Sequence, residues 1–323
     1  MEKLAHNSYK KILMISIVAI VVIVAIKMGI KNDEFHITQF EKAGYKIENV
    51  HIKVEDIDRP YHFIWVSDLH ITIPNDEVAE SDKPTVQARE NAFVNENGIK
   101  SHDVWADSLP KLLDEAHADG IFFGGDMIDF CSEATVSCLK NGLSSIKTPY
   151  MYIRADHDVY PFWLTEQDLG HGKSLQDTVC KNEDIMYMEY EKFIILGFNN
   201  STSQLPPQAL EKLTELSQKN KPIILLTHVP IHSQVDSSLE DASRAAWSDR
   251  DLTWGNATTY YVPDNNTQKI LDLIYAPDSK VSEVLGGHLH FSWDGKITEN
   301  VHEHVFGPAF QGYIGVITID NGR

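Results

Sequence analysis

Five short segments rich in Asp and His, each directly after a run of apolar residues, constrain this chain more than any other feature of its sequence. The apolar runs have the length and composition of buried β-strands, and sheet-based folds place their binding sites at strand ends. Unrelated surface turns would have no reason to repeat this arrangement, so we expect the segments to converge on one site. They are residues 67–70 (SDLH), 125–129 (GDMID), 155–158 (ADHD), 227–228 (TH) and 287–290 (GHLH).

The residue types in these segments indicate a metal site. Alternate residues of an extended segment project to the same side, so Asp68 and His70 can face one pocket, as can His288 and His290. Each segment alone is weak evidence, since a lone Asp-x-His is usually a surface loop and GDxxD is often a helix cap. Mixed carboxylate and imidazole ligands suit manganese, iron or zinc and disfavour a copper–thiolate or iron–sulfur site.

The order D-x-H, GDxxD, a GNH-like block, a single His and GHxH resembles that of the calcineurin-like metallophosphoesterase superfamily, over residues 68–290. The resemblance implies an α/β fold of four layers, a two-sheet β-sandwich flanked by helices, with metals bound at strand-end loops. It also implies hydrolysis of a phosphomonoester or phosphodiester by a hydroxide that bridges two divalent metal ions of the Mn, Fe or Zn type.

The resemblance further implies roles for nine Asp and His residues of the five segments. His157 would contact the phosphoryl oxygen or assist the leaving group, and Asp129 would orient His157. Asp126 would bridge the two metals. The first metal would be held by Asp68, His70, Asp126 and His290, and the second by Asp126, Asp156, His228 and His288.

Two positions depart from the family pattern. Asp156 stands where the family usually carries Asn, which adds a negative charge that weakens the attraction for an anionic phosphate and tightens metal binding. Phe130 follows GDxxD where protein Ser/Thr phosphatases carry Arg, which argues against that branch. Asp156 keeps open a second hypothesis, a degenerate, non-catalytic membrane protein that binds metal and a phosphorylated ligand. The presence of both His157 and Asp129 favours the enzyme.

The net charge and the cysteine content argue against several other classes of protein. The formal net charge of −19 argues against a surface for duplex nucleic acid, whereas metal ions could still attract a phosphorylated small-molecule or lipid substrate. The three cysteines form neither a disulfide scaffold nor a CxxC zinc module. Buried thiols are favoured, and a Cys131–Cys138 or Cys138–Cys180 bridge stays open for a domain outside the cytoplasm.

The N-terminus predicts a membrane anchor. Residues 12–26 (ILMISIVAIVVIVAI) carry no charge, and extension to residue 30 gives nearly enough helix for a span. A cleaved signal peptide competes, but no A-x-A-like site follows, so an uncleaved anchor is favoured. We therefore expect a cytoplasmic N-terminus and an extracytoplasmic catalytic domain. The expected divisions are 1–11 (cytoplasmic), 12–30 (anchor), 31–46 (linker) and 47–323 (phosphoesterase domain).

Two long polar stretches, residues 74–103 and 230–266, are expected to be excursions, the first of them over the mouth of the site. A helix is expected over 104–118, in which Pro110 sets a kink or a second helix start. Residues 187–198 fit one long strand or a strand pair. Trp247, Trp254, Tyr260 and Tyr261 fit a sugar- or lipid-facing wall or ordinary packing, which is favoured. His302 and His304 are expected to lie in an ordinary strand.

Overall fold

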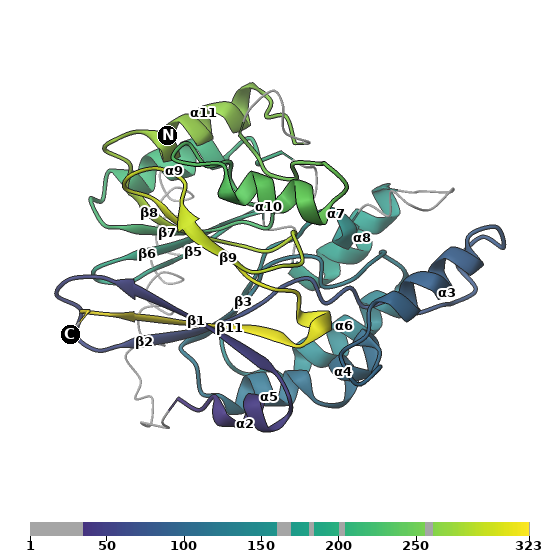
Figure 1. The fold of residues 1–323 in the computed structure, drawn as a ribbon. Coiled ribbons are helices and arrows are strands. Elements are labelled where there is room, and N and C mark those ends of the chain that lie inside the picture. Colours follow the sequence, from purple (N-terminus) through teal and green to yellow (C-terminus); the bar gives the residue numbers. More distant parts are fainter. Residues whose placement is uncertain (1–34, 160–168, 181–183, 200–203, 256–260, 323) are drawn as a thin grey trace, which may run out of the picture. The chain divides into compact units, whose positions relative to one another are not determined.

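The computed structural model describes residues 35–159, 169–180, 184–199, 204–255 and 261–322. Residues 36–323 form one compact unit. This unit contains two mixed β-sheets flanked by helices (Figure 1), which confirms the sandwich expected from the sequence.

The first sheet has five strands in the order β1-β11-β2-β3-β4. Strands β2, β3 and β4 run parallel to one another, so their carboxyl ends meet at one edge. The strand β11 is parallel to β1 and antiparallel to β2. The strands are β1 (Lys46–Lys53), β2 (Tyr61–Val66), β3 (Gly120–Phe123), β4 (Tyr150–Tyr152) and β11 (Tyr313–Asp320).

The second sheet has six strands in the order β5-β6-β7-β8-β10-β9. Its four central strands are parallel, and an antiparallel strand closes each edge. Residues 187–198 thus belong to a strand pair and not to one long strand. The strands are β5 (Ile185–Glu189), β6 (Ile194–Phe198), β7 (Ile223–Leu226), β8 (Val281–Gly286), β9 (Trp293–Lys296) and β10 (His302–Val305).

One apolar core lies between the sheets and includes Phe63, Trp65 and Phe122 of the first sheet and Ile224 and Leu285 of the second. These side chains are at most 1% exposed. A second core joins the other face of the six-stranded sheet to α9 (Ala209–Ser217) and α11 (Asn265–Tyr275). Burial on both faces explains the nearly continuous apolar runs of the central strands. It also makes the strand ends rigid supports for the loops that follow them.

Helices occupy the outer faces (Figure 1). The expected helix over 104–118 is in fact two helices. Pro110 lies in the first turn of the second one, α5. Each long polar stretch contains a helix, α3 in the first and α10 in the second. The helices are α2 (Thr38–Lys42), α3 (Lys83–Ala92), α4 (Ser101–Asp107), α5 (Leu109–Glu115), α6 (Glu133–Ser145), α7 (Asp156–Val159), α8 (Leu169–Cys180), α9 (Ala209–Ser217), α10 (Ser238–Ala246), α11 (Asn265–Tyr275) and the 3-10 turn η1 (Ala309–Gln311).

The expected anchor, residues 12–30, lies outside the described residues. Among the residues that are described, no helix is long and apolar enough to cross a membrane. The segment expected as a linker, 31–46, contains the short helix α2, whose Phe40 is fully buried, and ends on the first residue of β1. The three cysteines are free thiols.

Candidate metal centre

The five Asp/His segments follow β2, β3, β4, β7 and β8, as the sequence predicted. The parallel order within each sheet brings their carboxyl ends to a common edge. Main-chain bonds then tie neighbouring loops together: the amide of Asp68 donates to Gly125 O at 3.0 Å, and the amide of His70 donates to Asp126 O at 2.9 Å. The site is therefore built on short loops fixed at both ends.

Five of the expected ligands have a left-handed backbone conformation. Such a conformation is uncommon for non-glycine residues, although Asp and His adopt it more readily than most, and it costs about 1–3 kcal/mol per residue. The extended geometry that we assumed for the Asp-x-His and His-x-His pairs is therefore wrong, although each pair does reach the same site. The φ angles are +55° (Asp68), +51° (His70), +51° (Asp126), +69° (His288) and +56° (His290).

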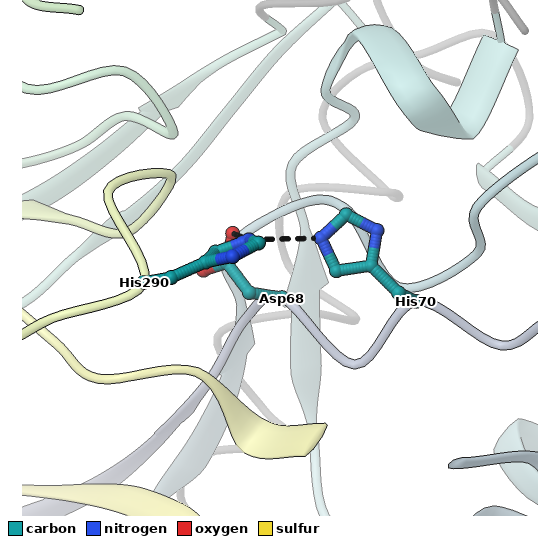
Figure 2. A group of neighbouring side chains, drawn as sticks. All are labelled: Asp68, His70 and His290. Carbon is teal, nitrogen blue, oxygen red and sulfur yellow. Dashed lines mark hydrogen bonds and ion pairs between the residues drawn. The ribbon is translucent and has the colours of Figure 1, made fainter. Parts of the chain in front are cut away.

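Asp68, His70 and His290 form the first group (Figure 2). The Nε2 atoms of His70 and His290 are 3.0 Å apart, and Asp68 Oδ1 lies 3.5 Å from His290 Nε2. Asp68 is fully buried. Two imidazole nitrogens and a carboxylate oxygen that point at one another are the donors expected around one cation.

Asp126, His228 and His288 form the second group. His228 Nε2 lies 3.1 Å from Asp126 Oδ2 and 3.3 Å from His288 Nδ1. His228 Nδ1 is 2.8 Å from Gly124 O, and the tautomer that donates there leaves Nε2 as the ligand atom. Asp126 Oδ2 is also 3.8 Å from His70 Nε2. Asp126 thus lies between the two groups.

Asp156 and His157 come from the first turn of α7. Together with Asp126 they form a third group of possible ligands. Asp156 Oδ1 accepts a 3.0 Å hydrogen bond from the amide of His157. Asp156 thus reaches the site, but it is grouped with His157 and not with His228 and His288. Asp126 is the member that the two groups share.

Asp129 contacts two histidines. Its Oδ1 lies 3.2 Å from Nδ1 of His70 and 3.2 Å from Nδ1 of His157. Arg89 of α3 binds the same carboxylate, with Nε 2.5 Å from Oδ2 and Nη2 2.5 Å from Oδ1. Sequence reasoning missed Arg89 because no motif surrounds it. The only signal was that it is one of few cations in an acidic stretch that was expected to cover the site.

Asp158 is a second residue that the sequence analysis left without a role. Its buried carboxylate accepts hydrogen bonds from four backbone amides and from the Tyr152 hydroxyl. These contacts hold the loop after β3 against the start of α7, and so fix Asp126 relative to Asp156. In the sequence, its place as the second Asp of the ADHD segment could have indicated that Asp158 has a role at the site. The amides belong to Asp126, Met127, Ile128 and Ala155.

Burial and charge divide the histidines into two kinds. Burial lowers the pKa of His70 to about 4 and, together with the charge of His228, that of His288 to about 3. Both are therefore neutral near pH 7, the form that binds metals. Burial would also lower the pKa of His228 and His157, but Asp126 and neighbouring carboxylates raise both to about 10. The negative charge of the carboxylates thus strongly favours positive charge at this site.

The residues fit bound divalent metal ions. Asp126 Oδ1 and His288 Nε2 are buried and have no hydrogen-bond partner among the described residues. Such orphaned atoms are rare unless a ligand satisfies them. Glycine is needed beside them: a Cβ on Gly287 would lie 2.5 Å from Asp68 Oδ2, and one on Gly125 would lie 2.9 Å from His228 Nδ1. Glycine at these two positions therefore allows the oxygen and nitrogen donors to lie close together.

Aromatic side chains wall the centre. Phe93 stacks on His70 with ring centroids 4.3 Å apart, and Phe310 meets His290 edge-on at 5.2 Å. Trp247, from the second polar stretch, contacts His290 and donates to Leu289 O. Both long stretches thus supply residues at or beside the centre. Trp254 is buried in the core, as expected of packing, and Tyr260 lies outside the described residues.

The comparison with protein families identifies this architecture. The model of the calcineurin-like phosphoesterases matches residues 61–292, so the chain belongs to this family. Membership supports metal-dependent hydrolysis of phosphoesters as the general activity, and it agrees with the clustered His and Asp ligands described above. No curated protein matches the chain.

Several solved structures are similar to this chain at low identity. A dimetal phosphatase from Danio rerio is 12% identical with a TM-score of 0.46, over 78% of this chain and 88% of that one. The phosphopantetheinyl hydrolase from Mycobacterium tuberculosis is 10% identical with a TM-score of 0.38, over 78% and 91%. A purple acid phosphatase from yellow lupin seeds is 12% identical with a TM-score of 0.42, over 81% of this chain and 44% of that one.

Proposed function

We propose that this protein hydrolyses a phosphomonoester or phosphodiester with two divalent metal ions of the Mn, Fe or Zn type. The observation that carries the proposal is the position of Asp126, which lies between the Asp68–His70–His290 group and the His228–His288 pair. A shared carboxylate between two ligand groups is the arrangement that a two-metal site requires. We assign the first metal to the former group with Asp126, and the second to Asp126, Asp156, His228 and His288.

When bound, the cations would supply Lewis acidity, neutralise phosphate oxygens and activate water as the nucleophile. The chain itself supplies positioning and a proton. His157 is held at Nδ1 by Asp129, so the proton that it exchanges with the substrate is the one at Nε2. Donation of that proton to the leaving oxygen is a general acid step. Phe93, Phe310 and Trp247 limit the access of water around His70 and His290.

The proposal is tested with the full chain, loaded with Mn²⁺ or Zn²⁺ and assayed on p-nitrophenyl phosphate and bis(p-nitrophenyl) phosphate. We expect activity that chelation removes and added metal restores. Asp126→Asn should lower kcat/KM by 100-fold or more, on the order of a metal-site loss, and His157→Ala by roughly 100-fold, the effect of losing a general acid. The exposed His51→Gln serves as control and should match wild type.

A metal-loaded wild type no faster than Asp126→Asn and His157→Ala on every substrate would contradict the enzyme and favour a non-catalytic protein that binds metal and a phosphorylated ligand. Asp156 is the observation behind this second function. Its carboxylate adds a negative charge beside Asp126, and an additional anion weakens the attraction for phosphate.

The charge of Asp156 gives a separate prediction. Asp156→Asn should keep two metals and bind inorganic phosphate more tightly, by roughly 10-fold, because removing one negative charge next to the anion is worth about 1 kcal/mol or more. The inhibition constant of phosphate measures the effect, and metal analysis verifies the loading. Asp107→Asn, which removes the same charge at an exposed position of α4, is the control. Equal inhibition of wild type and Asp156→Asn would contradict the charge argument.

We further propose that residues 12–30 anchor the protein in a membrane with the catalytic domain on the extracytoplasmic side. The uncharged apolar run with flanking lysines supports this location. A substrate at that position would be a phosphorylated small molecule or a phosphorylated lipid. The net charge of −19 disfavours duplex nucleic acid as a partner.

A further inference from the structure

A second cluster of metal-binding side chains lies on the six-stranded sheet, away from the strand ends. Glu283 of β8 and His302 and His304 of β10 bring ligand atoms within 4.8 Å of one another. His302 is directly opposite Glu283, and His304 is directly opposite Asp294 of β9. Residues opposite each other project from the same face of a sheet, as do alternate residues of one strand. All four side chains therefore share one face.

This cluster is separate from the centre proposed above. Glu283 lies three residues before the end of β8, which is roughly 10 Å along the strand before the loop with His288 begins. None of its members belongs to the groups formed by the strand-end residues. Neither the phosphoesterase motif nor the mechanism proposed for it uses these residues.

The contacts of His304 orient it as a ligand. Its Nδ1 is 2.5 Å from Asp294 Oδ2, and its Nε2 is 3.1 Å from Glu283 Oε2. A histidine that donates Nδ1–H to a carboxylate presents an unprotonated Nε2, which is the usual way in which proteins orient a metal-binding imidazole. The side chain of His304 is only 8% exposed, so its position is fixed by packing.

His302 completes a three-ligand set. Its ring centroid lies 5.1 Å from that of His304, and it belongs to the same group of possible ligands. Tetrahedral bonds of about 2.0–2.1 Å separate neighbouring donor atoms by about 3.3 Å, which is close to the contact between Glu283 and His304. Two imidazoles and one carboxylate are a zinc ligand set that leaves the fourth position for water.

We propose that Glu283, His302 and His304 bind a zinc-type transition metal, with Asp294 as the hydrogen-bond partner that orients His304. The metal would join β8, β10 and, through Asp294, the edge strand β9. An ion that connects three strands stabilises the edge of the sheet. The ion would thus reinforce the edge of this sheet, and the site is independent of phosphoester hydrolysis.

The test counts zinc in the purified full chain, by elemental analysis after equilibration with Zn²⁺ and removal of loosely bound ions. We expect His302→Gln and Glu283→Gln each to hold one zinc fewer than wild type and to keep wild-type phosphoesterase activity. Asp294→Asn should weaken zinc binding at this site by roughly 10- to 100-fold without removing a ligand. His51→Gln, at an exposed position of β1, is the matched control and should not change the zinc count.

A second measurement uses the Asp126→Asn background, in which the strand-end centre is impaired. Zinc should still raise the melting temperature there, and His302→Gln should abolish that rise while leaving the melting temperature in chelator unchanged. An equal zinc count in wild type and His302→Gln overturns the proposal. So does a zinc-induced rise that survives His302→Gln, because the ion then lies elsewhere.

Discussion

Arg89 is the residue that most changes the description of the candidate centre. It binds Asp129 through two nitrogens, and Asp129 contacts both His70 and His157. Burial would raise the pKa of Asp129, but Arg89 and the two histidines keep it well below its usual range. Asp129 is therefore a charged acceptor that holds one proposed ligand and the proposed proton donor together. An arginine from a polar excursion thus stabilises the centre from outside the family motif.

This arrangement predicts a dependence on the leaving group. Arg89→Gln should misplace His157, and a misplaced proton donor matters most when the leaving oxygen is basic. We expect kcat to fall by about 10-fold or more for phenyl phosphate and distinctly less for p-nitrophenyl phosphate. Arg59→Gln is the matched control, because Arg59 forms a similar two-nitrogen contact with Asp119 next to the starts of β2 and β3. An equal loss for both substrates would show that Arg89 does not act through His157.

At the residue scale the sequence predicted which side chains meet but not how the backbone presents them. Asp68, Asp126 and His288 were found from their order after apolar runs, a signal that requires no tertiary information. Their left-handed conformations depend on hydrogen bonds between loops far apart in the sequence, such as that from Asp68 to Gly125. Arg89 was not predictable because its contact with Asp129 spans 40 residues and follows no periodic pattern.

At the scale of elements, β10 has two faces with different chemistry. His302 and His304 project to the proposed zinc site, whereas Glu303 projects to the other face and is fully buried. Glu303 Oε1 accepts a hydrogen bond from Ile231 N at 2.9 Å, and Oε2 has no partner among the described residues. Burial, with a further contribution from Glu240, raises the pKa of Glu303 well above its usual value.

The raised pKa of Glu303 predicts a pH-dependent stability. An acid with a raised folded-state pKa contributes stability below its unfolded pKa of about 4.3 and loses it as pH rises toward the folded pKa. Glu303→Gln removes this loss. The free energy of unfolding of the variant, relative to that of wild type, should therefore increase by about 1 kcal/mol or more as pH rises from 5 to 8. Urea denaturation at both pH values measures the gain, and a pH-independent difference would contradict it.

The elements themselves were predicted unevenly, for a physical reason. Strands such as β3 and β7 are buried on both faces and read as continuous apolar runs, so they were found directly. Helices α3 and α10 lie in polar stretches with few buried residues, so no apolar face marked them in advance. Both stretches nevertheless bring Arg89 and Trp247 to the centre, because tertiary contacts and not local periodicity determine their position.

At the scale of the whole molecule, the chain combines a phosphoesterase unit with an apolar N-terminal segment. The unit belongs to the calcineurin-like phosphoesterases over residues 61–292. The segment 12–30 has a composition suited to a membrane but lies outside the described residues. Anchoring would confine hydrolysis to substrates that reach the membrane surface.

The proposed anchor predicts where the protein is found. The full chain should remain in the membrane fraction after alkaline extraction, whereas a variant without residues 12–30 should be soluble. The N-terminal sequence of the purified protein separates an anchor from a cleaved signal peptide, because only the anchor retains residues 12–30. Protease added to intact cells should digest the catalytic unit. Digestion only after lysis would contradict an extracytoplasmic location.

The left-handed backbone at Asp68, His70, Asp126, His288 and His290 also restricts which sequences this centre can tolerate. Asparagine adopts this conformation readily, whereas a β-branched residue does so only at high cost. A scan with alanine or valine at these positions would therefore combine two losses, that of a ligand and that of a favourable main chain. Replacement by asparagine keeps the main-chain preference and changes only the donor group. Backbone preference and metal chemistry thus both restrict which substitutions this centre can accept.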